Sequence, residues 1–484
     1  MKQASDRQPS KLSFGDTLSL IFGIVVGVSI FSVPPSVFAG SGGTLAAIGI
    51  WLLGGLLALC GALCYGELAA MYPEFGAEYL YLSKGFGRRI GFVYAWMQMT
   101  VILTGSIGVM SFAFADYAGH AIPSIESFSG LLAAGAIAIP GAWQFLGLRT
   151  GKLAQNVLSF GKLLSLAVIL VCGVMFVPSH VATSELPEAT NSWMTPGLAF
   201  VFVLYAYGGW SDVAMVTPEV HDCRRTMPRA LLFGLGGITV LYILLNIAYV
   251  RVLGYDGLIR SSAPAADVVS RTWGVSSGWI MSGMVMLSAL GAINGMLFAG
   301  CRLLVAVGRD YPRFRSWTEW SRSQTPFLAL VSLLGISLIM VLVVGTPSGR
   351  DGVDAVYRWC GLFTPDWEKY GRGFDTLVAA TAPIFWGFFT LSGMAVIVLR
   401  MTRPELERPF HVPLYPVTPL IFIASSVYML WSSLDYARQL TVLMLPFLVI
   451  GCLLAFILKY SPDGSDASPR IADLPAAESS DQNP

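Results

Sequence analysis

Two glycine-containing interruptions of apolar segments are the features of this sequence with the clearest capacity for chemistry. The first interruption is Gly23-Ile24-Val25-Val26-Gly27-Val28-Ser29, followed by Pro34-Pro35, and the second is Tyr205-Ala206-Tyr207-Gly208-Gly209-Trp210. Adjacent glycines leave helical geometry easily, because glycine has no side chain to pack and the largest backbone freedom. Inside lipid, such a break leaves N–H and C=O groups without partners, which is tolerated only around a cavity or a ligand. Paired breaks of this kind are typical of the binding site of a transporter.

Two charged residues lie close to these breaks or at the same depth. Lys162 follows Lys152 by ten residues, which places it roughly 15 Å into a hydrocarbon core about 30 Å thick. A lysine at that depth does not reach the interface, so we expect a functional ammonium; a segment boundary wrong by one turn would instead make it interfacial. Asp212 directly follows the second break. From its position, we expect Asp212 to complement the dipole of the helix that it begins. The alternative is that its carboxylate reaches a substrate amine or pairs with Lys162.

The composition excludes several other kinds of protein. Of the 484 residues, 55% are hydrophobic and 12% are charged, whereas soluble proteins carry about 25% charged residues. The net charge of +1 gives no reason to expect a nucleic-acid partner. The seven cysteines and four histidines are scattered, so we expect no metal site and no cofactor. No cluster of nucleophile and base residues at one depth supports an enzyme.

The elements that must position these residues are predicted as twelve membrane-spanning helices, because about 20 apolar residues cross a bilayer. They fall at 14–38, 43–71, 90–116, 128–147, 153–177, 195–220, 229–253, 276–307, 326–345, 375–401, 416–434 and 438–459. Residues 1–12 are predicted to form a short cytoplasmic tail. Residues 461–484 are rich in Ser, Asp, Pro and Ala, which predicts a disordered cytoplasmic tail.

Lys and Arg in the short loops set the orientation. They concentrate on one side, for example at Arg224, Arg225 and Arg229, which places both termini in the cytoplasm and the chain in a cell (plasma or inner) membrane. With an even number of spans the two ends share a side. Spans one and six then run in opposite directions, which predicts two five-span units of inverted topology, 13–177 and 195–401, with 416–459 adding two helices. The predicted fold is an all-α integral membrane protein.

Six motifs in order carry a family resemblance. They are the first interruption, Gly66-Glu67-Leu68 with Pro73, Gln155-Asn156 with Gly161-Lys162, Tyr207-Gly208-Gly209-Trp210 with Met227-Pro228-Arg229, Asn294-Gly295 with Arg302-Leu303, and Arg403-Pro404-Glu405 with Arg408-Pro409-Phe410. Across most of residues 12–420 the sequence resembles the amino acid–polyamine–organocation transporters, in their L-type amino acid transporter-like branch. The resemblance implies a leucine-transporter-type fold of 5+5 inverted repeats plus two helices.

The resemblance also implies that one amino acid binds between the unwound parts of spans one and six. Free N–H groups at the positive end of a half-helix suit the carboxylate, and free carbonyls suit the ammonium. The N–H groups implied are those of Gly27, Val28 and Ser29. The carbonyls implied are those of Val25, Tyr205, Ala206 and Gly208.

Further roles follow from the same resemblance. Tyr205 occupies the place of an aromatic gate over the substrate. Apart from the resemblance, Trp210 is a second candidate for gating, although aromatic residues in spans are more often packing residues or interfacial anchors. Lys162 stands where a sodium ion binds in coupled relatives, and its ammonium would contact carbonyls of span one and Ser288 of span eight. Relatives in this branch are joined to a partner glycoprotein through an outer-loop cysteine after span three. Residues 119–128 contain no cysteine, so no disulfide-linked partner is expected.

One departure from the family pattern bears on the substrate. The family has Gly-Ser-Gly in span one, where this chain has Gly27-Val28-Ser29. Valine is β-branched and stiff, which predicts a tighter or reshaped pocket. The two broken spans together with Lys162 lead us to expect a sodium-independent amino acid exchanger that works by alternating access. The alternatives are a proton-coupled symporter of cationic amino acids or polyamines, favoured if Asp212 faces the pocket, and a nutrient receptor that does not transport.

Overall fold

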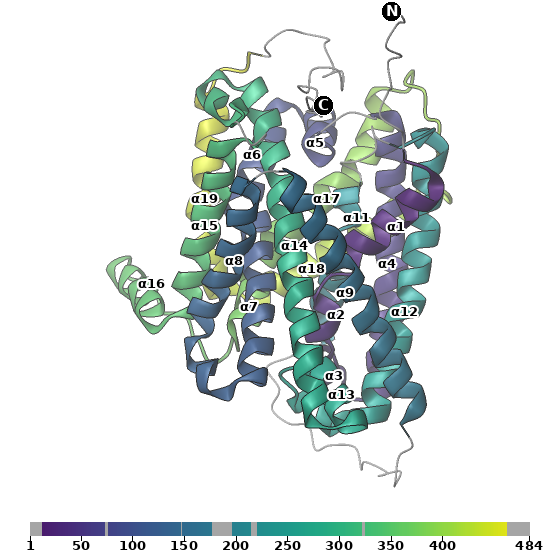
Figure 1. Cartoon of the computed structure of the whole chain (residues 1–484). Coiled ribbons are helices and arrows are strands. Elements are labelled where there is room, and N and C mark those ends of the chain that lie inside the picture. The colour runs from purple at the N-terminus through teal and green to yellow at the C-terminus, as the bar shows by residue number, and fades with distance from the viewer. Residues whose placement is uncertain are drawn as a thin grey trace, which may run out of the picture.

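The computed structural model describes residues 12–72, 76–146, 148–176, 196–213, 220–321 and 325–461. Within these ranges the chain is helical, with isolated bridges joining Leu12 to Val220 and Trp320 to Pro326. The helices pack side by side into one bundle (Figure 1). The described part of the chain is therefore all-α, as the apolar pattern predicts.

The first part of the bundle contains the first broken helix. Its elements are α1 (Phe14–Val25), α2 (Ser29–Ser32), α3 (Pro34–Ser41), α4 (Thr44–Met71), α5 (Glu78–Phe86), α6 (Arg88–Met97), the π-helix η1 (Gln98–Ile102), α7 (Leu103–Ala121), the 3₁₀ helix η2 (Pro123–Phe128), α8 (Ser129–Leu146) and α9 (Leu148–Met175).

The second part contains the second broken helix. Its elements are α10 (Pro196–Ala206), α11 (Trp210–Val213), α12 (Cys223–Arg260), α13 (Pro264–Trp273), α14 (Val275–Asp310), the 3₁₀ helix η4 (Pro312–Thr318), α15 (Phe327–Gly345), α16 (Pro347–Trp359), α17 (Gly373–Thr402), α18 (Val417–Tyr436) and α19 (Arg438–Ile457).

Ten of the twelve predicted spans correspond to helices that are long and apolar enough to cross a membrane. The fifth and sixth spans correspond to shorter apolar helices within the described residues, Gly161–Met175 and Pro196–Ala206. Both of these lie next to residues whose placement is not described. The chain is thus a multi-pass membrane protein, and the number twelve stays a prediction. α1 begins and α19 ends at the same end of the bundle, shared with α5, while α3 and α13 lie at the other end (Figure 1).

The first break begins at Val26, where the backbone leaves helical geometry with ψ 83°. The preceding helix, α1, begins with a capping box: the Ser13 side chain accepts from Asp16 N, and the Asp16 side chain accepts from Ser13 N. Beyond the break, Val33 keeps right-handed helical dihedrals between α2 and α3. The two short helices therefore form one second half-helix from Ser29 to Ser41.

The second break lies between α10 and α11, where the sequence predicts it. Gly209 has φ +96°, a conformation that side-chain-bearing residues rarely adopt. A glycine is therefore required at this position by the backbone itself.

Small residues on α4 and α12 let both broken helices pack closely. A Cβ at Gly54 would lie 2.4 Å from Val203 of α10, and one at Gly55 would lie 2.4 Å from Thr239 of α12. A Cβ at Gly234 of α12 would lie 2.6 Å from Ile21 of α1. Small residues at helix interfaces permit such approach in membranes. Helices α4 and α12 thus hold the two breaks in one place.

Candidate functional site

The two breaks contact each other directly. A Cβ at Gly209 would lie 3.2 Å from the carbonyl oxygen of Ile24 and 3.4 Å from Cα of Val25. Gly209 is therefore needed for this approach as well as for its positive φ. The predicted site residues on the two segments are brought together.

Tyr242 of α12 links the two breaks through its hydroxyl. Its Oη lies 3.2 Å from the carbonyl oxygen of Val25 and 3.1 Å from that of Ala206. A hydroxyl has one proton to donate, so the two carbonyls share it. The ring packs on Trp51 and on Tyr207, with centroids 5.5 and 5.0 Å away. Tyr242 is not among the site residues predicted from the sequence; the available signal was a tyrosine inside an apolar span, whose buried hydroxyl needs a partner.

The N–H groups at the first break divide into used and unused donors. Gly27 N donates to the carbonyl oxygen of Val25 at 2.8 Å, so this predicted donor is already engaged. The N–H groups of Val28, Ser29 and Ile30 have no acceptor among the described residues. They lie at the positive end of the second half-helix, Ser29 to Ser41, where an anion is stabilised. The arrangement thus offers Val28, Ser29 and also Ile30 to a carboxylate.

The carbonyls predicted to receive an ammonium are mostly partnered within the protein. Val25 and Ala206 share Tyr242, and Tyr205 accepts from Gly208 N at 3.0 Å. A carbonyl oxygen has two lone pairs. Val25 already accepts from both Gly27 N and Tyr242, so an ammonium would have to replace the tyrosine hydroxyl there, whereas the oxygen of Ala206 keeps capacity for a further donor. The second break can therefore accept hydrogen bonds from a cationic group.

Lys162 is buried, and Nζ donates to the carbonyl oxygen of Gly23 at 2.6 Å. Gly23 lies in the last turn of α1, next to the first break. Ser288 of α14 is also buried, but its Oγ has no hydrogen-bond partner in the described part of the chain. The structure therefore joins Lys162 to span one and does not join it to Ser288.

A small cavity lies beside the second break. Its volume is about 10 Å³, which holds roughly one water molecule. It is lined by Ile102, Ser106, Val201, Tyr205, Thr381, Ala382, Phe385 and Trp386. Ile102 ends the π-helix η1, a local irregularity frequent at functional sites. The bundle is closed around this point, with Tyr205 in the cavity wall.

Trp210, the other candidate for gating, lies elsewhere. It is buried in an aromatic cluster with Tyr65, Phe389 and Phe422, with ring centroids 4.8, 5.2 and 6.0 Å away. A Cβ at Gly61 would lie 2.8 Å from the indole. The contacts of Trp210 are packing contacts among α4, α17 and α18. The side chain of Asp212 lies outside the part of the structure that is described.

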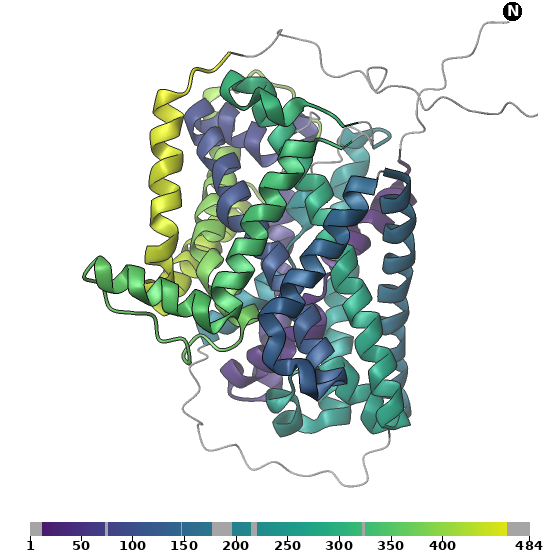
Figure 2. The same cartoon turned by 60° about the vertical axis from the view of Figure 1, so that its left-hand side comes forward.

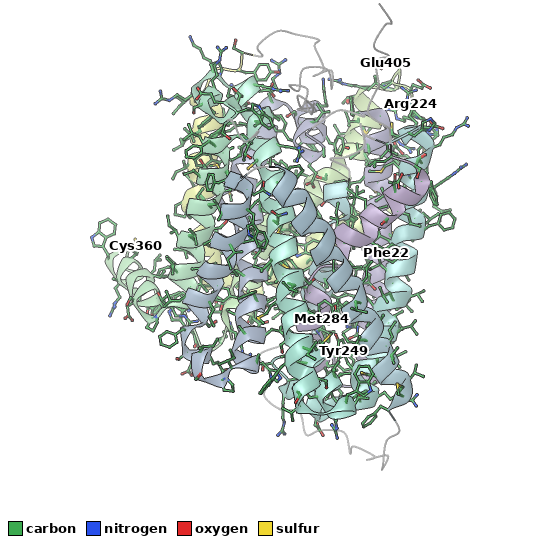
Figure 3. All side chains as sticks on the ribbon, in the orientation of Figure 1. Phe22, Arg224, Tyr249, Met284, Cys360 and Glu405 are labelled. Atoms are coloured by element: carbon green, nitrogen blue, oxygen red, sulfur yellow. The ribbon has the colours of Figure 1, made fainter. Side chains whose placement is uncertain are left out.

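Pro34 and Pro35 explain two further tyrosines near the site. A proline has no N–H, so each one leaves the carbonyl four residues earlier without its helical donor. These carbonyls belong to Ile30 and Phe31. Tyr249 Oη lies 3.3 Å from the first and Tyr117 Oη lies 2.6 Å from the second. Figure 3 shows Tyr249 inside the half of the bundle that contains α2 and α3. In the sequence, the paired prolines indicate two carbonyls that need donors, and the two tyrosines are not among the predicted site residues.

Comparison with known proteins decides the family. The family profile described as amino acid permease matches residues 12–456. The chain belongs to the amino acid permease family. This permease is accordingly a transport protein of the membrane and not an enzyme.

Several curated relatives align with most of this permease. Mouse b(0,+)-type amino acid transporter 1 is 29% identical over 426 residues, which cover 85% of this chain and 80% of the mouse protein. Mouse Asc-type amino acid transporter 1 is 30% identical over 437 residues, with coverages of 87% and 77%. Mouse large neutral amino acids transporter small subunit 2 is 30% identical over 427 residues, with coverages of 85% and 75%. The resemblance to the L-type branch is thereby confirmed.

Proposed function

We propose that this permease is a sodium-independent amino acid exchanger that works by alternating access. It binds the zwitterion between the broken helices α1/α2 and α10/α11, within a leucine-transporter-type fold of two five-span repeats plus two helices. Both termini lie in the cytoplasm, and no partner subunit is attached by a disulfide. The relatives described as transporters of amino acids support the substrate class.

The observation that carries the proposal is the junction of the two breaks. Three adjacent N–H groups, from Val28 to Ile30, have no acceptor among the described residues. The carbonyls of Val25 and Ala206 lie within reach of one hydroxyl, that of Tyr242, and are therefore close to each other. Donors for a carboxylate and acceptors for an ammonium thus come from backbone. Backbone recognition leaves the side chain of the substrate unconstrained by these contacts.

The position of Lys162 supports sodium independence. Its ammonium donates to a carbonyl of the last turn of α1, and a carbonyl oxygen of that kind is what a sodium ion would require. A fixed positive charge repels a second cation at the same place. In this proposal the ammonium of Lys162 takes the structural role of a sodium ion. Asp212 stabilises α11 by placing a negative charge near the N-terminus of that helix.

The test is uptake of labelled amino acids into proteoliposomes. We expect uptake that requires unlabelled amino acid inside, that is equal in sodium and choline, and that does not follow a proton gradient. Uptake into empty vesicles driven by the proton gradient would instead support the proton-coupled symporter. Saturable binding without flux would support a receptor. Either outcome would overturn the exchanger.

The same assay tests Lys162. Its charge-assisted hydrogen bond contributes about 1.5–3 kcal/mol, so we expect exchange by Lys162→Ala to fall by roughly tenfold or more. Lys84→Ala removes an exposed lysine of α5 and should leave exchange unchanged. Wild-type exchange by Lys162→Ala in sodium-free buffer would contradict the assigned role.

A further inference from the structure

Helix α16 projects sideways from the bundle beside the start of α19 (Figures 1 and 2). It begins at Pro347, directly after the apolar helix α15 ends at Gly345. Thr346 caps it by accepting from Gly349 N at 3.1 Å. The chain then returns to the bundle at Gly373, where α17 begins. The projecting helix therefore lies beside the end of α15 and the start of α19, away from the end of the bundle where α1 begins (Figure 1).

Specific contacts fix the height of α16 relative to the spans. Tyr357 Oη donates to the carbonyl oxygen of Gln439, in the first turn of α19, at 2.5 Å. Arg350 Nε donates to the carbonyl oxygen of Val344, in the last turn of α15, at 2.7 Å. Because both partners lie in terminal turns of candidate membrane spans, α16 is held at the level where those spans leave the hydrocarbon.

The apolar side of α16 is wider than the surface that the bundle covers. Val353 and Tyr357 share one face and are 6% and 3% exposed. On the adjoining face and in the following turn, Trp359 and Phe363 are 88% and 90% exposed, and Val356 is 53% exposed. Most of the surface of Trp359 and Phe363, and about half of that of Val356, is therefore left uncovered by the described part of the protein. Figure 3 shows Cys360, beside Trp359, at the outer tip of this helix.

The opposite face of α16 is polar. Asp351 and Arg358 are seven residues apart, share that face and are exposed. The helix has 13 residues, about 20 Å in length, which is too short to cross a core of about 30 Å. A short helix with one apolar and one charged face lies in the plane of the membrane interface.

We propose that α16 and the turn through Phe363 form an interfacial anchor that inserts into the headgroup boundary of the bilayer, on the side away from the start of α1 and the end of α19. The exposed apolar side continues the lipid-facing surface of the neighbouring spans, on which Leu342 of α15 and Leu445 of α19 are exposed. Tryptophan and other amphipathic aromatic side chains are enriched at this depth. Since α16 connects α15 to α17, the anchor fixes the outer ends of both helices relative to the membrane.

Spin labelling of the full-length chain in lipid nanodiscs tests the anchor. Single cysteines replace Phe363 or Asp351 in a chain whose native cysteines are changed to serine. Oxygen concentrates in lipid, whereas a nickel chelate stays in water. The accessibility of a spin label to each of the two therefore reports whether the label lies in lipid or in water. We expect the label at 363 to be at least threefold more accessible to oxygen than to the chelate, and the label at 351 to show the reverse. Equal chelate access at both positions would overturn the proposal.

A photocrosslinker covers the case in which the cysteine-free chain does not fold. Benzoylphenylalanine in place of Phe363, with all native cysteines retained, should crosslink to lipid under ultraviolet light in the same nanodiscs. The same residue in place of Asp351 is the matched control and should give little lipid adduct. A crosslink from position 363 to a second copy of the chain, or no lipid adduct, would overturn the anchor. Neither result depends on transport, so the exchanger proposal is tested separately.

Discussion

Pro34 and Pro35 determine which backbone groups in the second half of the first broken helix need hydrogen-bond partners. They remove two N–H groups and leave the carbonyls of Ile30 and Phe31 in need of donors. The hydroxyls of Tyr249 and Tyr117 supply those donors. The N–H groups at the start of the same half-helix receive no such partner among the described residues. The protein therefore satisfies the carbonyls of this short helix and leaves its donors open for an anion.

A conservative substitution tests this arrangement at the residue scale. Tyr117→Phe leaves the carbonyl of Phe31 buried without a donor, which costs about 1–3 kcal/mol. We expect lower thermal stability in detergent and weaker amino acid binding, because the half-helix loses a fixed position. Thermal unfolding and binding isotherms measure the two effects.

Tyr81→Phe is the matched control. Tyr81 is fully buried, and its hydroxyl has no hydrogen-bond partner in the described ranges. Removing that hydroxyl should leave stability equal or slightly higher. Equal losses in the two variants would show that the hydrogen bond of Tyr117 contributes nothing specific.

At the scale of elements, a buried ion pair joins the end of α17 to α4. Glu67 accepts from Arg400 at 2.8 and 2.5 Å and from Val412 N at 2.7 Å. Arg408 lies 3.9 Å from the same carboxylate. The aromatic ring of Tyr415 packs 3.8 Å from the guanidinium of Arg400. One carboxylate thus holds two helices and the segment after α17 together.

Loss of the charge on Glu67 should loosen this junction. Glu67→Gln leaves the arginines without their counter-ion, and breaking a buried pair costs about 3–5 kcal/mol. We expect a clear fall in thermal stability in detergent. The control is Glu407→Gln, which removes the exposed partner of Arg224 and should change stability by about 0–1 kcal/mol. Figure 3 shows Arg224 at the same end of the bundle as Glu405. Equal effects of the two substitutions would show that Glu67 is not a structural junction.

The apolar lengths predicted most of the elements, because a bilayer imposes one length on every span. The second break was predicted correctly because Gly209 adopts a conformation that only glycine readily adopts. The first break was predicted, but Val26 begins it, so glycine content alone did not locate its start. The hydroxyl of Tyr242 and the carbonyl of Val25 are 217 residues apart in sequence, and the Glu67–Arg400 pair is 333 residues apart. Such pairings follow from packing in three dimensions, which periodicity does not describe.

At the scale of the whole molecule, the described residues leave little space beside the second break. The cavity beside Tyr205 holds about 10 Å³, far less than an amino acid occupies. In the alternating-access cycle that we propose, helices separate on one side and then on the other. The hydrogen bonds of Glu67 join α4 to α17 at the end of the bundle where α1 begins (Figure 1). The hydrogen bond of Tyr117 joins α7 to the half-helix formed by α2 and α3, toward the other end. We infer that these two junctions open alternately.

The central claim is that one amino acid lies between the two breaks. The most direct measurement is an experimental structure of the permease with the labelled amino acid that gives the fastest exchange. The account predicts its carboxylate within hydrogen-bond distance of the N–H groups of Val28, Ser29 and Ile30, with its ammonium against the carbonyls of Val25 and Ala206. An amino acid bound only in the cavity beside Trp386, or on the bundle surface, would contradict it.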